Sequence, residues 1–131
     1  MNVFVIDTHA LAWFFAEDSR LSPTVDSILV RAEATTAQIL IPTLVLAELT
    51  LISQKQRVPI AIAVILEAIQ ETTSFIIVDF DFSVFQTFLE FPQTWDLHDR
   101  IIAATAKRYS AKLITRDEEL RSSNIIETVW D

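Results

Sequence analysis

The chain has 131 residues, of which 51% are hydrophobic and 10% aromatic, and its 18 acidic and 10 basic side chains give a net charge of −8. This length and composition predict one folded domain over residues 1–131 and exclude a mainly disordered chain. The absence of cysteine excludes disulfides, thiolate metal sites and a cysteine nucleophile, and the acidic charge argues against a broad electrostatic binder of nucleic acid.

Apolar segments of strand length alternate with helical segments along the chain. The stretch NVFVI at residues 2–6 is typical of a buried strand, and Ser22 before Pro23 is typical of a helix N-cap. The alternation predicts an α/β fold, a three-layer sandwich whose central, mainly parallel sheet of about four or five short strands is flanked by helices. The expected elements, in chain order, are a strand at Asn2–Ile6, a helix at Ala10–Phe15, a helix from Ser22 through Ala32, a strand at Ile39–Ile41, a helix capped by Thr43, a helix from Pro59 to about Ile69, a strand at Phe75–Val78, a helix from Asp81 or Ser83 to Leu89, a helix from Asp96–Asp99 to about Tyr109, a strand at Leu113–Thr115, a helical turn at Glu118–Arg121 and an edge strand at Ile125–Val129.

Four acidic residues occupy positions where a parallel sheet binds ligands, beyond the carboxyl ends of its strands. Asp7 directly follows the first predicted strand, and Asp117 lies two residues past Leu113–Thr115. Asp99 lies in the first turn of a predicted helix, and Glu48 lies one turn into the helix that follows the second strand. Each residue alone is equally typical of a helix cap, a first-turn acid or a half-exposed glutamate. Their combined placement favours one shared site.

Other side chains receive mainly structural interpretations. The complete lack of glycine excludes glycine-rich phosphate and dinucleotide loops, so Ser110, Ser123 and Asn124 are expected to serve the left-handed turns. His9 and His98 are too few for a zinc site, and His98 is expected to be a structural or surface residue. Trp95 is expected to be exposed in a loop. Helical spacing predicts that one aromatic set packs inside: Phe80, Phe82, Phe85 and Phe88.

Four blocks of the sequence, VIDTHALAWFF, VLAELT, WDLHDRIIAATA and LITRDEEL, together resemble the PIN-domain nucleases. The similarity is greatest to the VapC-type toxins of bacterial type II toxin–antitoxin pairs, and it extends from about residue 3 to residue 121. It implies a PIN-like fold and, position by position, an acidic quartet. The quartet would be Asp7, Glu48, Asp99 and Asp117.

The resemblance implies hydrolysis of RNA phosphodiesters that depends on Mg²⁺ or Mn²⁺ and leaves a 5′ phosphate and a 3′ hydroxyl. Asp7, Asp99 and Asp117 would be the main metal ligands, with Glu48 binding through water or at a second metal. Clustered carboxylates are hard oxygen ligands that suit these ions, and a bound metal relieves their mutual repulsion and activates water. Candidate supporting residues are Thr8, Asp96, Arg100, Thr115, Arg116 and Glu119.

The resemblance also implies partners, namely an RNA substrate, a second copy in a homodimer and a cognate antitoxin protein. DNA would be bound only indirectly, through the antitoxin. Without a secretory signal or a long apolar run, we expect a cytoplasmic location and no membrane partner. Two alternatives stay open, a catalytically inactive PIN-like protein-binding module and an aspartyl-phosphate receiver or phosphotransferase that uses Asp7.

Overall fold

Strands and helices alternate through residues 2–55 and 57–131, which the computed structural model describes. This alternation confirms the α/β class. In chain order the elements are β1 (Asn2–Ile6), α1 (Thr8–Phe15), α2 (Pro23–Glu33), β2 (Ala37–Pro42), α3 (Thr43–Gln54), α4 (Ile62–Glu71), β3 (Phe75–Val78), α5 (Phe82–Phe88), α6 (Leu97–Arg108), β4 (Lys112–Ile114), α7 (Glu118–Ser122) and β5 (Thr128–Val129).

The strands form one five-stranded sheet in the order β3-β2-β1-β4-β5, and each neighbouring pair is parallel. On one side of β1, Phe4 pairs with Ile39 of β2, and on the other side Ile6 pairs with Ile114 of β4. The chain therefore builds the sheet outward from β1 in both directions. In open parallel sheets, such a switch point leaves a crevice at the carboxyl ends of the strands.

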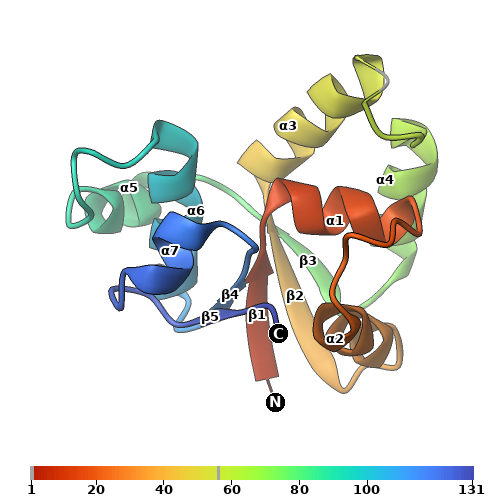
Figure 1. The fold of residues 1–131 in the computed structure, drawn as a ribbon, viewed down its shortest axis with the longest axis horizontal. Coiled ribbons are helices and arrows are strands. Elements are labelled where there is room, and N and C mark those ends of the chain that lie inside the picture. The colour runs from red at the N-terminus through yellow and green to blue at the C-terminus, as the bar shows by residue number, and fades with distance from the viewer. Residues whose placement is uncertain (1, 56) are drawn as a thin grey trace.

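Helices cover the sheet from both sides, with α1 to α4 grouped at the right of Figure 1 and α5 to α7 at the left. This three-layer arrangement buries the central strands, whose sequences are correspondingly apolar. No helix in the described part of the chain is both long and apolar enough to cross a membrane. The largest fully buried side chains include Ile6, Leu11, Leu29, Ile39, Ile41, Leu49 and Leu113.

Two predicted helix starts are wrong. Thr43 is the first residue of α3 rather than its cap, because Pro42 takes the N-cap position without a side-chain hydrogen bond. α4 begins after the cap residue Ala61, not at Pro59. The Ile60 N–H donates to the carbonyl of Val58 at 2.8 Å, and this tight turn around Pro59 delays the helix. The last strand is also shorter than predicted, at Thr128–Val129.

Left-handed backbone occurs at non-glycine residues. Within the described ranges, Glu17, Thr35, Ser110 and Asn124 have positive φ angles of 53°, 65°, 52° and 59°. This confirms the turn role expected for Ser110 and Asn124, whereas Ser123 has right-handed φ and ψ of −72° and −27°. Because a Cβ atom disfavours this region, these turns carry conformational strain that glycine would avoid.

The aromatic predictions for the second half of the chain are wrong except for that of Phe88. Phe80, Phe82 and Phe85 are 43%, 70% and 38% exposed, and of this set Phe88 alone is buried. The short helix α5 packs against α6, so one side of it is covered and the other carries rings into solvent. Trp95 is buried at 8% exposure instead of exposed. Phe80 lies outside α5, and helical spacing alone does not show which side of so short a helix faces the core.

Ser22 links the start of α2 to the end of the chain. Its Oγ accepts a hydrogen bond from the Val25 N–H at 3.1 Å and donates one to the carbonyl of Trp130. We predict that Ser22→Ala lowers the free energy of unfolding by about 2 kcal/mol, because both buried backbone groups lose their partner. Urea denaturation measures the loss. Ser27→Ala, exposed on the same helix, is the matched control, and equal stability of the two variants would contradict the prediction.

Candidate active site

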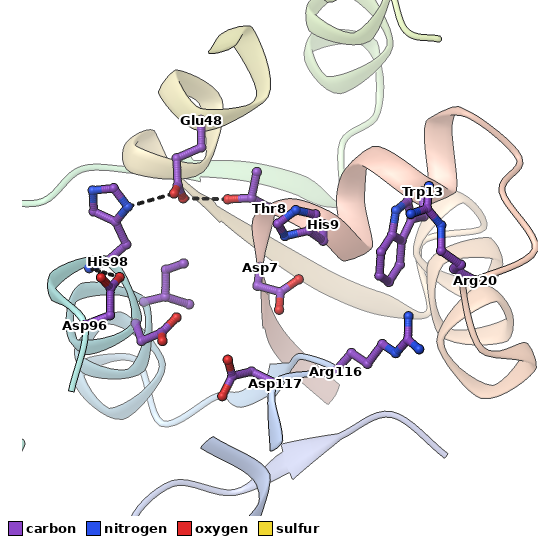
Figure 2. Close-up of a pocket in the computed structure, with 12 residues that line it drawn as sticks. Asp7, Thr8, His9, Trp13, Arg20, Glu48, Asp96, His98, Arg116 and Asp117 are labelled. Atoms are coloured by element: carbon purple, nitrogen blue, oxygen red, sulfur yellow. Dashed lines mark hydrogen bonds and ion pairs between the residues drawn. The ribbon is translucent and has the colours of Figure 1, made fainter. Parts of the chain in front are cut away.

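A cavity of about 580 Å³ lies at the carboxyl ends of β1 and β4 (Figure 2). The Asp7 N–H continues the β1–β4 ladder by donating to the carbonyl of Ile114 at 3.1 Å. This bond places the residues after the two strands at one edge of the sheet. The lining residues are Asp7, Thr8, His9, Trp13, Arg20, Glu48, Asp96, His98, Asp99, Ile102, Arg116 and Asp117.

Two of the predicted acids are also helix caps. Asp7 Oδ1 accepts from the Ala10 N–H at 2.9 Å and caps α1, and Asp117 Oδ1 accepts from the Leu120 N–H at 3.0 Å and caps α7. Each cap uses one carboxylate oxygen and orients the other, so capping and ligand binding are compatible. Burial raises the pKa of Asp7 above its ordinary value, although hydrogen bonds from Thr115 and Ala10 oppose this shift.

The other two aspartates of the cavity come from α6. Asp96 is the N-cap of this helix, and Asp99 lies in its first turn. Burial, followed by the charges of Asp117, Asp96, Asp7 and Glu119, raises the pKa of Asp99 to about 6. The site therefore holds more negative charge than its own polar groups balance, which is the electrostatic condition that favours cation binding.

Glu48 is held between two other elements. Thr8 Oγ1 of α1 donates to Glu48 Oε1 at 2.6 Å, and His98 Nδ1 of α6 lies 2.9 Å from Glu48 Oε2 (Figure 2). His98, which the sequence indicated as a structural or surface residue, is thus a partner of a proposed site residue. Both oxygens of Glu48 are oriented, so α1, α3 and α6 are tied together at the cavity.

An aromatic and basic wall forms another part of the cavity. The Cζ atoms of Arg20 and Arg116 lie 4.9 and 5.5 Å from the ring centroid of Trp13, and the ring of His9 lies 5.7 Å from that ring. No site role is predicted from the sequence for Trp13, Arg20 or His9. The four-residue separation of His9 and Trp13 could have indicated that the two rings lie together, because it puts both residues on one face of α1.

Three candidate supporting residues do not line the cavity. Arg100 lies with its Cζ 4.0 Å from the Phe88 ring, between α5 and α6, so it is placed as a packing residue. Thr115 is fully buried beneath the cavity, where its Oγ1 accepts from the Asp117 N–H at 3.1 Å. Glu119 is exposed on α7 and acts on the site through its charge.

The donor chemistry of the cavity fits a hard divalent cation. Asp7, Asp99 and Asp117 supply carboxylate oxygens, the ligands that Mg²⁺ and Mn²⁺ prefer. In the described residues, no three carboxylate or histidine side chains lie close enough together to hold a metal ion as they stand. Mg²⁺ keeps several waters in protein sites, so an open arrangement of acids is compatible with it.

The chain is similar in sequence to a ribonuclease and in structure to several solved proteins. It is 28% identical over 134 residues to ribonuclease VapC22 of Mycobacterium tuberculosis, covering 99% of this chain and 100% of that one. A structure of VapBC2 from Rickettsia felis, bound to a DNA fragment from its promoter, superposes with a TM-score of 0.71 at 18% identity, covering 98% and 99% of the two chains. The sarcin–ricin-loop-cleaving toxin VapC20 of M. tuberculosis superposes with a TM-score of 0.66 at 18% identity, covering 99% and 100%.

The family assignment follows from the sequence itself. Residues 4–124 match the PIN domain family, which confirms the resemblance seen in the four sequence blocks. The superpositions confirm the fold expected from that resemblance, a parallel sheet flanked by helices. The chain belongs to the PIN domain family.

Proposed function

We propose that this protein is a metal-dependent endoribonuclease and the toxin of a VapC-type toxin–antitoxin pair. The observation that carries the proposal is the convergence of Asp7, Glu48, Asp99 and Asp117 in one cavity of a PIN domain. The similarity to a protein named ribonuclease VapC22 over 99% of the chain supports the RNA substrate.

In this proposal Asp7, Asp99 and Asp117 hold Mg²⁺ or Mn²⁺, directly or through water. When bound, the metal supplies charge stabilisation at the phosphate and lowers the pKa of a water. The hydrogen bonds at Asp7 and Asp117 fix one oxygen of each carboxylate, and both side chains line the cavity. Glu48, oriented by Thr8 and His98, is placed to orient the attacking water or a second metal. The expected products are a 5′ phosphate and a 3′ hydroxyl.

The partners follow from the same assignment. We propose a cognate antitoxin that blocks the acidic cavity, contact with DNA only through that antitoxin, and a homodimer. Superposition on the VapBC2 structure and on a toxin–antitoxin complex from Klebsiella pneumoniae supports the antitoxin. The net charge of −8 favours a basic segment on the side of the antitoxin. We place the active protein in the cytoplasm, where its RNA substrate is found.

Cleavage of total RNA tests the nuclease assignment. We expect discrete cleavage with Mg²⁺ or Mn²⁺, none with EDTA, and a loss of about 100-fold or more in Asp7→Asn and Asp117→Asn, because each removes a ligand charge that stabilises the transition state. Asp26→Asn, exposed on α2, is the matched control and should cleave normally. End-sequencing of the products identifies the target. Absence of cleavage by folded, antitoxin-free protein in both metals would favour the inactive binding module.

The Thr8–Glu48 hydrogen bond generates a second prediction. Thr8→Val keeps the shape of the side chain but removes the donor to Glu48 Oε1, so we expect cleavage to slow by about 10- to 100-fold, the usual effect of losing a group that orients a site carboxylate. Thr8→Ser restores the hydroxyl and should recover most of the rate. Equal rates for Thr8→Val and the unmodified protein would show that this contact does not position Glu48.

The raised pKa of Asp99 predicts that its ionisation lowers the free energy of unfolding of the metal-free protein in a pH-dependent way. The pKa of Asp99 is about 6 in the folded protein, compared with an ordinary value of 3.8. The loss in the free energy of unfolding is therefore complete above pH 6 and disappears as the pH falls below 3.8. Asp99→Asn should therefore melt about 3 °C higher than the unmodified protein at pH 7.5 in EDTA, which corresponds to about 1 kcal/mol after allowance for solvent screening of a half-exposed group. At pH 3, below both pKa values, the two proteins should melt together, and a lower melting temperature for the variant at pH 7.5 would refute the electrostatic argument.

A further inference from the structure

The cavity that holds the acids has a second, oppositely charged part. Arg20, Trp13 and Arg116, here called the Arg–Trp cluster, come from three segments: the turn after α1, α1 itself, and the segment after β4. Figure 2 shows Arg20 and Arg116 beside Trp13, with Asp117 and Asp7 on the side toward α6. All five residues line the same cavity, so a ligand that fills it meets negative groups at one end and guanidinium groups at the other.

We propose that the Arg–Trp cluster is a phosphate-binding subsite, which holds the RNA phosphate next to the scissile one and so sets the direction in which the strand crosses the acids. The inference rests on the proposed ribonuclease function and deepens it. A polyanion entering an acidic cavity is repelled unless cations lie beside its path. The two arginines that line the cavity are placed to supply them.

Arg20 and Arg116 both keep N–H donors available for a ligand. Arg20 donates from Nε and Nη2 to the two oxygens of Asp18, at 3.0 and 2.7 Å, and this pairing lowers the pKa of Asp18 to about 2. A guanidinium has five N–H donors, so Arg20 keeps donors for a ligand. Arg116 makes no ion pair or hydrogen bond through its guanidinium within residues 2–55 and 57–131. Both groups can therefore bind a phosphate, for which arginine has the matching planar geometry.

Trp13 makes the cluster rigid. Its ring is 6% exposed and packs at 6.0 Å, edge to face, against Trp130. The indole Nε1 is buried without a hydrogen-bond partner among the described residues, so packing rather than polar bonding determines where the ring lies. A fixed aromatic face restricts both guanidinium groups by cation–π attraction, which reduces the entropy that they lose when a phosphate binds.

The local sequence directs Arg116 to this position. Thr115 is fully buried, and its hydroxyl bonds the Asp117 N–H. Side chains alternate along extended backbone, so Arg116, between these two residues, points away from the Thr115 side. It extends to Trp13 instead of pairing with the neighbouring carboxylate of Asp117. Its charge stays available for an external anion.

Binding of an uncleaved probe tests the subsite without requiring activity. A fluorescein-labelled 12-nucleotide oligouridylate is titrated in EDTA at several salt concentrations, and its anisotropy is recorded. We expect Arg20→Gln and Arg116→Gln each to weaken binding about tenfold and to reduce the slope of log K against log salt by about 0.7, the value for one phosphate contact on a single strand. Arg31→Gln, exposed on α2, is the matched control and should bind normally.

Neutralised phosphates then identify the contact in RNA that the protein cuts. A methylphosphonate at one neighbour of the cleavage position should slow the unmodified protein, and the same change should have no further effect on Arg116→Gln. The proposal is overturned if the unmodified protein does not bind the probe at low salt, or if both arginine variants match Arg31→Gln in affinity and salt slope. Arginine-dependent binding without cleavage in any metal would support the subsite and refute the nuclease function.

Discussion

The parallel pairing of β1 with β4 is the contact on which the site depends. It pairs residues 4–6 with residues 112–114, more than a hundred positions later in the chain. The Asp7 N–H extends this pairing by donating a hydrogen bond to the carbonyl of Ile114. Since β1 also pairs with β2 on its other side, the chain leaves β1 at the switch point of the sheet. Asp7 and Asp117 therefore follow adjacent strands and meet in the crevice that this topology leaves open.

Helix starts give these acids fixed orientations in the absence of a ligand. Asp7, Asp96 and Asp117 are each the N-cap of a helix, and the positive end of a helix dipole lowers the cost of holding negative charge nearby. The compensation is incomplete, because the pKa of Asp99 still rises to about 6. The fold thus orients the acids through caps and leaves their mutual repulsion partly unbalanced. That residual repulsion is what a cation would relieve.

Much of this arrangement could be predicted from the sequence because it follows from short-range rules. Asp7 directly follows one predicted strand and Asp117 closely follows another, so in a parallel sheet the two residues lie at the same edge. Ser22 with Pro23 marks a helix start. Contacts set by packing direction could not be predicted in this way. Phe82 has helical spacing to its neighbours yet is 70% exposed, since spacing does not say which face a short helix turns toward the core.

Arg20 shows the same limit within the site. It reaches Trp13 from the turn after α1, where Glu17 has a φ angle of 53°. No glycine marks this left-handed residue, so the sequence carried no signal that the turn would bring residue 20 back toward the cavity. The basic end of the cavity therefore emerged only with the three-dimensional structure.

The two ends of the cavity also explain how a chain of net charge −8 could engage a polyanion. Repulsion between exposed charges is screened beyond about 10 Å at 0.1 M salt, so the charge that a bound strand experiences is local to the cavity. There Arg20 and Arg116 lie on the Trp13 face and can bind an anion, while the charges of Asp7, Asp99 and Asp117 repel a phosphate placed between them until a cation is bound. Binding at the basic end and metal-dependent acceptance of a phosphate at the acidic end would restrict cleavage to strands that satisfy both ends at once.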